Sequence, residues 1–190
     1  MEDYTSYETV RNKLITAGIK ELQNHGVADF SLRRVAAMCN VSCAAPYKHF
    51  KSKEDFIAEI LRYINVQWEL IQNQVKEIFS SDKKRQLTEI CVAYIKFRIA
   101  NPGFNAVLMM KTDDFDENTL SGSHMTDYIC RLITDIFESR GMTQSVIEQK
   151  KYVIRSLIYG AVIMIDKCQM SSDAENIAMI KQCIEDALSD

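Results

Sequence analysis

A group of basic side chains near the start of the chain is the clearest indication of chemistry in this sequence. Between Phe30 and Lys53 the chain has five Lys or Arg residues and no Asp or Glu. The five are Arg33, Arg34, Lys48, Lys51 and Lys53. Ammonium and guanidinium groups form strong, charge-assisted hydrogen bonds with phosphate oxygens. A segment with this charge pattern is typical of one that binds a polyanion such as nucleic acid.

The net charge of the whole chain conceals this basic segment. Residues 1–53 contain eight Lys or Arg and five Asp or Glu, a net charge of +3, so the remaining residues contribute −6 to the total of −3. Because the two parts differ in sign, we expect only the N-terminal part to attract a polyanion.

A short helix followed by a tight turn must position the first of these cations. Ser31 is suited to cap this helix, and Phe30 and Val35 occupy the hydrophobic staple positions on either side of the cap. Residues 40–42, Asn-Val-Ser, then predict a turn.

A second short helix follows the turn at once. Ser42 is a good N-cap for a helix over residues 43–50, which places Pro46 in the first turn, where a missing N–H costs least. Residues 52–55, Ser-Lys-Glu-Asp, form a capping box that opens a much longer helix. Two short helices with such a turn indicate helix-turn-helix geometry, in which the second helix enters the DNA major groove.

Residues 10–56 resemble the N-terminal domain of the TetR family of bacterial transcriptional regulators. The family's landmarks occur in order, namely Gly26, Ser31, Val41-Ser42, Tyr47-x-x-Phe50 and Lys53-Glu54. Ala44 and Asn40 stand where glycine is usual. Asn tolerates a positive φ, so we expect the turn to form. Ala44 is predicted to alter how closely the recognition helix meets DNA.

The resemblance implies a set of DNA-binding residues on these helices. They are Ser31, Arg33, Arg34, Ser42, Cys43, Ala44, Ala45, Tyr47, Lys48, His49 and Lys53. It implies that Tyr47 bonds a phosphate, the alternative being an aromatic residue of the domain core. Lys53 opposes the helix dipole at the start of its helix, which a nearby phosphate would explain. The small residues at 43–45 favour base reading by apolar contact with thymine methyl groups.

Several residues of this set have a second interpretation. His49 is expected either to contact DNA or to bond neighbouring backbone, and Lys48 is either a phosphate contact or solvated surface. One of Arg33 and Arg34 is expected to meet the DNA backbone. Cys43 is either a small first-turn residue or a redox-sensitive thiol whose pKa is lowered by neighbouring cations.

Composition predicts an all-α fold of two domains. The chain has 190 residues, 47% hydrophobic and 26% charged, with two Pro, six Gly and no sustained alternation of polar and apolar residues. We expect an N-terminal three-helix helix-turn-helix domain over 1–52 and a C-terminal helical bundle for dimerisation and effector binding over 53–190. Further helices are predicted at 53–79, 84–100, 102–110, 124–140, 144–168 and from a cap at Ser172 to about 188.

The sequence gives little support for an enzymatic or a metal-binding site. Glu21 and His25 are one residue too far apart for the Glu-x-x-His pair of a di-iron bundle, and the chain has three His in all. The HExxH, GxSxG and P-loop motifs are absent, and the six Cys show no metal-ligand spacing. The acidic run at 113–118 lacks the Gly and Glu of a calcium loop. We therefore expect the protein to have no enzymatic activity and to bind no metal and no cofactor.

Aromatic, Met and Arg residues of the C-terminal part are candidates for an effector pocket. They are Trp68, Tyr94, Phe97, Arg98, Phe104, Met109, Met110, Tyr128 and Tyr159. Such residues at helical spacing are more often plain core, so about a third are expected to line a cavity. The predicted effector is a small apolar or amphipathic molecule, and an anionic one if Arg98 points inward.

The predicted function is that of a homodimeric regulator, usually a repressor, which binds a palindromic double-stranded operator and is released by an effector. Residues 144–188 are predicted to hold the dimer, because they have more apolar surface than one small core needs. The residues concerned are Ile154, Leu157, Ile158, Ile177, Ile180 and Ile184. The alternative is a DNA-binding structural or interaction protein without an effector. The acidic start and a longest apolar run of nine residues predict a cytoplasmic protein outside the membrane.

Overall fold

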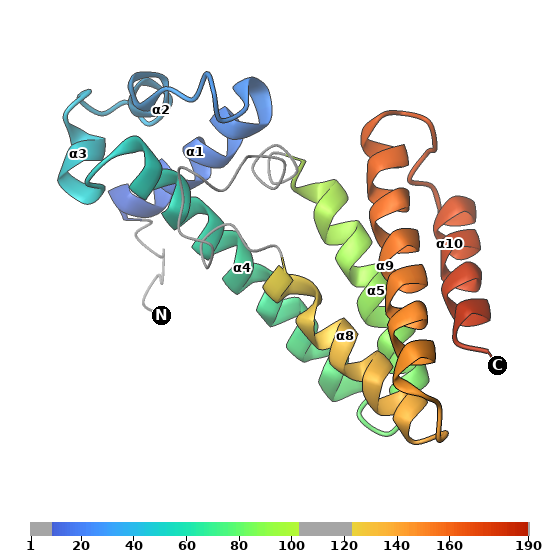
Figure 1. The fold of residues 1–190 in the computed structure, drawn as a ribbon. Coiled ribbons are helices and arrows are strands. Elements are labelled where there is room, and N and C mark those ends of the chain that lie inside the picture. Colours follow the sequence, from blue (N-terminus) through green and yellow to red (C-terminus); the bar gives the residue numbers. More distant parts are fainter. Residues whose placement is uncertain (1–8, 103–122, 190) are drawn as a thin grey trace, which may run out of the picture. The chain divides into compact units, whose positions relative to one another are not determined.

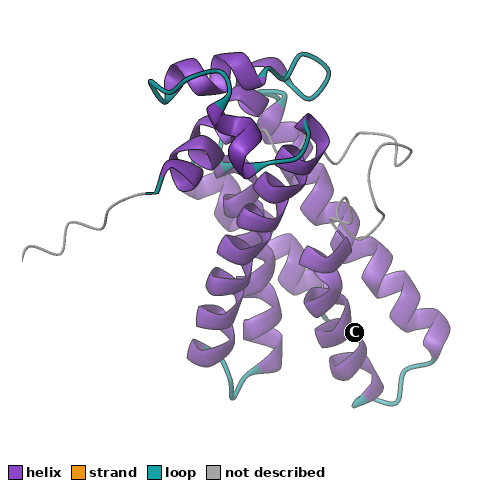
Figure 2. Ribbon diagram, turned by 90° about the vertical axis from the view of Figure 1, so that its left-hand side faces the viewer, coloured by secondary structure: helices purple, strands orange, loops and turns teal. Residues whose placement is uncertain are grey.

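The computed structural model describes residues 9–102 and 123–189, and in this part of the chain helices are joined by loops and turns, with no strand (Figure 2). Its eight helices are α1 (Val10–His25), α2 (Leu32–Met38), α3 (Ala45–His49), α4 (Lys53–Ile78), α5 (Lys83–Ala100), α8 (Ser123–Glu138), α9 (Gln144–Asp166) and α10 (Ala174–Ala187) (Figure 1). The predicted all-α fold is confirmed. The predicted helix at 102–110 lies almost wholly outside the described residues.

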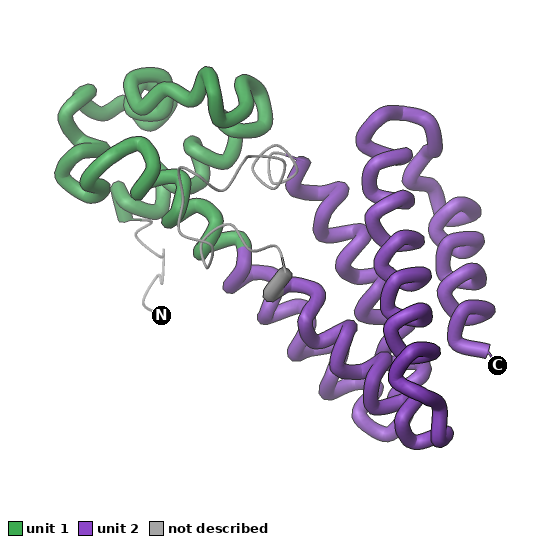
Figure 3. Tube along the Cα trace, viewed as in Figure 1, with its two compact units in different colours: residues 1–64, 103–121 green, residues 65–102, 122–190 purple. Residues whose placement is uncertain are grey.

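The chain forms two compact units, and the boundary between them falls inside α4 (Figure 3). Described residues 9–64 belong to the first unit, which therefore includes α1, α2, α3 and the start of α4. Described residues 65–102 and 123–189 belong to the second unit. Within the described residues, no helix is long and apolar enough to cross a membrane.

Three aromatic rings join aliphatic side chains in the core of the first unit. Phe50 stacks on Phe56 with ring centroids 4.1 Å apart, and Phe30 meets Phe56 edge-on at 5.7 Å. Gly18 lets α1 approach α4 closely, because a Cβ there would lie 2.6 Å from Cδ1 of Ile60. These contacts hold α2 and α3 against a rigid support.

The turn between α2 and α3 has the predicted geometry, whereas the cap of α3 differs. Asn40 adopts a φ of 54°, as its tolerance of the left-handed region predicts. The hydroxyl of Ser31 accepts the N–H of Arg34 at 3.4 Å, which confirms this cap. Ser42 does not cap α3, because the helix starts at Ala45 and Ala44 holds the cap position without a side-chain hydrogen bond.

The second unit is a bundle in which α5 contacts α8, α9 and α10, and α9 contacts both α8 and α10 (Figure 1). Its centre is fully buried and aliphatic apart from a few aromatic rings. The residues with no exposed surface include Leu87, Ile90, Tyr94, Ile129, Ile133, Phe137, Ile154, Ile158 and Ile184. The apolar residues Leu87, Ile90 and Tyr94 of α5 thus belong to this core.

Two details of the C-terminal helices differ from the predictions. Asp173, and not Ser172, caps α10, since its carboxylate accepts the N–H of Asn176 at 2.9 Å. Four of the six apolar residues predicted to hold a dimer, Ile154, Ile158, Ile180 and Ile184, are buried within the protomer. Helical periodicity locates an apolar face, but it does not say whether that face meets its own chain or a second copy.

Candidate nucleic-acid interface

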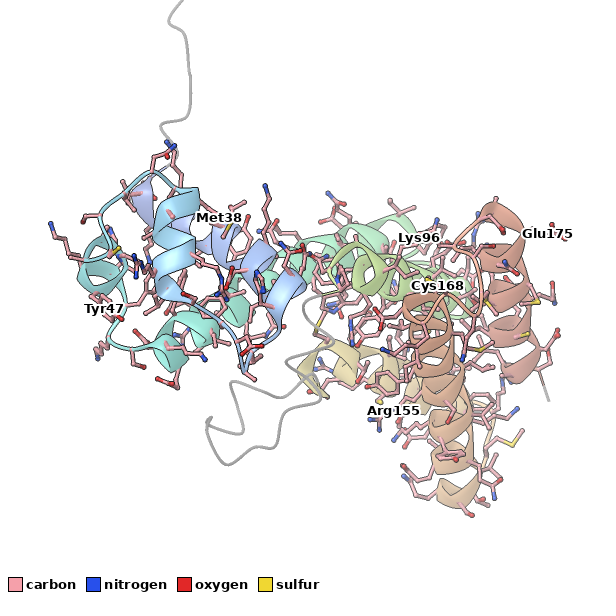
Figure 4. All side chains as sticks on the ribbon, turned by 90° about the horizontal axis from the view of Figure 1, so that it is seen from above. Met38, Tyr47, Lys96, Arg155, Cys168 and Glu175 are labelled. Carbon is pink, nitrogen blue, oxygen red and sulfur yellow. The ribbon has the colours of Figure 1, made fainter. Side chains whose placement is uncertain are left out.

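The outer surface of α3 and the turn before it is exposed and free of acidic residues. Tyr47 is 62% exposed, which excludes it from the domain core, and Figure 4 marks its place on α3. The other predicted residues of this surface that are exposed are Ser42, Cys43, Ala44, Lys48 and His49. Ala45 is half-buried. The exposed side chains are those that a helix in a major groove would turn toward the DNA.

The inner surface of α3 attaches the helix to the core. Pro46 is buried in the first turn of α3, as the sequence predicts. Phe50, immediately after α3, is buried and stacks on Phe56 of α4. The N–H of Phe50 donates to the carbonyl of Pro46 at 2.9 Å. A helix of five residues is too short to be stable alone, so this packing fixes its orientation.

The two arginines of α2 have different environments. Arg34 donates from Nε to Oε1 of Glu21 at 2.7 Å and from its guanidinium to the carbonyl of Asp29. The hydrogen bond to Glu21 raises the pKa of Arg34 above its usual value, and the nearby charges of Glu21 and Asp29 act in the same direction. Both arginines are exposed on α2, but among the described residues Arg33 has no such hydrogen-bond partner. Of the two, Arg33 is therefore the better placed to reach a DNA phosphate.

Glu21 is a residue that the sequence analysis did not identify as part of this region. Its carboxylate is 2% exposed and also accepts the backbone N–H of Ser31 at 3.1 Å. It thus orders the residue that caps α2 together with one of the α2 arginines. The signal was present, because Glu21 follows Gly18 by three residues and Leu14 by seven, which is the spacing of the buried face of α1.

Lys53 has a partner within the chain. Its Nζ donates to the carbonyl of Ala28 at 3.2 Å, which ties the start of α4 to the segment between α1 and α2. Ser52 caps α4 by accepting the N–H of Asp55 at 3.1 Å, as predicted. Hydrogen bonds from Ser52 and from its own N–H lower the pKa of Glu54. A phosphate is therefore not needed to explain a cation at this position.

The candidate effector residues of the second unit form a filled aromatic cluster. The ring of Trp68 lies 5.3 Å from that of Tyr94 and 5.6 Å from that of Phe97, and all three are buried. Arg98 is also buried, and its Nη1 donates to the hydroxyl of Tyr94 at 2.6 Å. Tyr159 is half-buried. Phe104, Met109 and Met110 lie outside the described residues.

A pocket of about 320 Å³ lies beside this cluster, between α4 and α8. It is lined by Asn65, Trp68, Glu69, Gln72, Met125, Asp127, Tyr128 and Arg131. Two of the predicted residues, Trp68 and Tyr128, line it, whereas Tyr94, Phe97, Arg98 and Tyr159 do not. Its polar residues were missed because Gln and Asn on an amphipathic helix are usually solvated surface. Within the described residues, no group of His, Cys, Asp or Glu is arranged to hold a metal.

Comparisons with known proteins agree with this architecture. Residues 14–60 match the family model of bacterial regulatory proteins, tetR family. No curated protein matches the chain by sequence. Several solved structures match almost the whole chain. They include a TetR-family transcriptional regulator from Bordetella parapertussis, with a TM-score of 0.71, 14% identity and 96% of each chain covered.

Two further solved structures extend the comparison. The TetR family regulator PfmR from Thermus thermophilus has a TM-score of 0.69 at 16% identity, with 95% of each chain covered. The fatty acid degradation regulator FadR from Bacillus halodurans has a TM-score of 0.66 at 14% identity, covering 94% of this chain and 97% of that one. At such low identities these structures show a common fold.

Proposed function

We propose that this chain, which belongs to the TetR family of bacterial regulatory proteins by its N-terminal segment and its fold, is a dimeric cytoplasmic repressor released by a small molecule. Residues 1–52 would bind the operator, and residues 53–190 would dimerise and bind the effector. The observation that supports DNA binding best is the exposed, acid-free surface of α3 above a packed aromatic support.

In this proposal α3 enters the major groove. Lys48 and Arg33 contact phosphates on either side of the groove, and the hydroxyl of Tyr47 bonds a third. Cys43 and Ala44, both exposed at the start of α3, meet the base edges through apolar contact. Because these side chains offer few base-specific hydrogen bonds, a single copy would discriminate weakly between sequences.

A second copy would supply the missing specificity. Two recognition helices about 34–36 Å apart would read successive major grooves of a palindrome. The surface that we propose for dimerisation is the exposed side of α9, where apolar residues recur at helical spacing. It comprises Tyr152, Val153, Ile163 and Met164, with Met179 of α10. An effector would favour a dimer whose recognition helices no longer match the operator, and a coupling of about 1–3 kcal/mol changes affinity about 5- to 150-fold.

Footprinting of the protein on DNA upstream of its own gene and the neighbouring genes tests this function. We expect one protected palindrome, with half-sites about 10 base pairs apart from centre to centre. Uniform binding to all DNA, with no protected site, would contradict an operator-specific regulator. If an operator is found but no compound from a broad screen both stabilises the protein and changes operator affinity, the effector-free alternative becomes the better explanation.

A further inference from the structure

The pocket between α4 and α8 offers buried hydrogen-bond acceptors that the described residues leave without donors. Oδ1 of Asn65 and Oε1 of Gln72 are buried and accept no hydrogen bond from any described residue. Gln72 is only 8% exposed. A buried carbonyl oxygen without a donor is unfavourable in the folded protein, and most such groups in native structures have a partner. Two in one pocket indicate that a ligand supplies the missing donors.

Two of the donors around the pocket are already used. Nε1 of Trp68 donates to the carbonyl of Met125 at 3.0 Å, and the hydroxyl of Tyr128 donates to Oε1 of Gln86 at 2.8 Å. Lys76 lies over the ring of Tyr128, 3.9 Å from its centroid, so this aromatic face already has a cation. The pocket would therefore recognise a ligand through acceptor atoms of the protein. The apolar parts of Trp68 and Met125 would form one wall of the site.

A carboxylate between the two unpaired amides favours a cation. Glu69 lies between Asn65 and Gln72 along α4, and the other two charged lining residues, Asp127 and Arg131, are of opposite sign. Asn65, Glu69 and Gln72 follow each other at helical spacing along one side of α4, so their acceptors span about 10 Å. A ligand that satisfies both buried amides must accordingly be elongated, with a donor near each end.

We propose that this pocket is the effector site and that it takes a small monovalent organic amine with a second N–H or O–H donor at the far end of an apolar chain. The inference rests on the proposed regulatory function, narrows the predicted apolar or amphipathic effector to a cationic one, and departs from the anionic alternative. Arg98, on which the anionic alternative depended, is buried beside Tyr94 and does not line this pocket.

Three compounds of one length separate the contributions of charge and donors. Aminopentanol carries the cation and a hydroxyl donor, pentanediol is neutral, and hydroxypentanoate replaces the cation with an anion. We expect saturable calorimetric binding of aminopentanol at neutral pH, weaker binding of pentanediol and none of hydroxypentanoate. Absence of saturable aminopentanol binding, or equal or tighter binding of hydroxypentanoate, would overturn the proposal.

Substitutions on α4 locate the binding. Gln72→Met removes the buried acceptor and retains an unbranched side chain, so we expect about tenfold weaker aminopentanol binding. The melting temperature of the ligand-free variant should stay the same or rise, because an unpaired buried oxygen is removed. Gln74→Met, which makes the same change at an exposed position of α4, should bind like the wild type. Unchanged binding by Gln72→Met would refute the assignment.

A second variant keeps the test valid if Gln72→Met does not fold. Glu69→Gln changes an exposed residue and should weaken aminopentanol binding while leaving pentanediol binding unchanged. Equal effects on both compounds would count against recognition of a cation. Operator binding is measured on the same samples. Operator binding without amine binding would reject this inference alone, whereas amine binding without any operator would reject the proposed function.

Discussion

The carboxylate of Glu21 on α1 accepts a hydrogen bond from Nε of Arg34 on α2, with 2.7 Å between the two atoms. The same carboxylate accepts the N–H of Ser31, the residue that caps α2. One buried acidic side chain thereby sets where α2 begins and how it lies on α1. The basic segment that attracts a polyanion is thus positioned in part by a carboxylate outside it.

This relationship predicts opposite roles for the two neighbouring arginines. Arg34→Ala leaves the buried Glu21 carboxylate without its main partner, so we expect the melting temperature to fall by several degrees. Arg33→Ala removes an exposed side chain and should leave the melting temperature almost unchanged while weakening DNA binding. Thermal denaturation and operator titration of both variants test this. Equal melting temperatures for the two variants would disprove the structural role of Arg34.

Loss of a phosphate contact should appear in the salt dependence of DNA binding. Lys48→Ala is expected to weaken binding and to reduce the slope of log K against log salt by about one unit, because one fewer counterion is released. Tyr47→Phe should weaken binding with little change in slope, since it removes a neutral donor. Titrations at several salt concentrations measure both effects.

Lys84→Ala is the matched control for the salt experiment. It removes the same charge from an exposed position of α5, in the second unit. We expect its slope to equal that of the wild type. If Lys48→Ala and Lys84→Ala change the slope equally, the effect reflects net charge and the assignment of Lys48 fails.

The exposed side of α9 should be necessary for dimerisation. Ile163→Arg places a charge on an apolar residue that is 46% exposed, so we expect a folded monomer at micromolar concentration by analytical ultracentrifugation. Leu70→Arg makes the same change on α4, where the side chain is 56% exposed, and should remain a dimer. A dimeric Ile163→Arg variant with native circular dichroism would show that another surface joins the protomers.

The cap of α10 predicts one component of acid sensitivity. Hydrogen bonds from the N–H of Asn176 and the hydroxyl of Ser171 lower the pKa of Asp173 below its usual value of 3.8. A lowered carboxyl pKa stabilises the folded state fully above that value, and this contribution disappears as the pH falls below it. Asp173→Asn retains a good cap that does not titrate, so it should lose less stability between about pH 6 and pH 3 than the wild type.

Urea unfolding at both pH values measures this contribution. Glu148, whose pKa is lowered chiefly by its hydrogen bond with Lys151, provides a comparison, because Glu148→Gln removes a titrating carboxyl without affecting a helix cap. An identical pH dependence for Asp173→Asn and the wild type would show that the cap contributes nothing measurable.

The sequence alone determined the local features of this protein. Capping and helix periodicity act over three to seven residues, so the Ser31 cap, the Asn40 turn and the extents of α4 and α5 followed from the residues in order. The charge pattern likewise indicated which end of the chain would meet a polyanion. Where two neighbouring residues compete for a cap, as at 172 and 173, the pattern was ambiguous by one position.

Only the tertiary structure decided which side chains remain available. Glu21 engages Arg34, Lys53 reaches the carbonyl of Ala28, and the apolar residues expected at a dimer face, such as Ile154, close the bundle of a single protomer. Each outcome depends on groups far apart in the sequence, whose contacts are chosen by the packing of whole helices. The unpaired amides of the α4 pocket arise for the same reason, because burial is a property of the assembled helices and not of one helix.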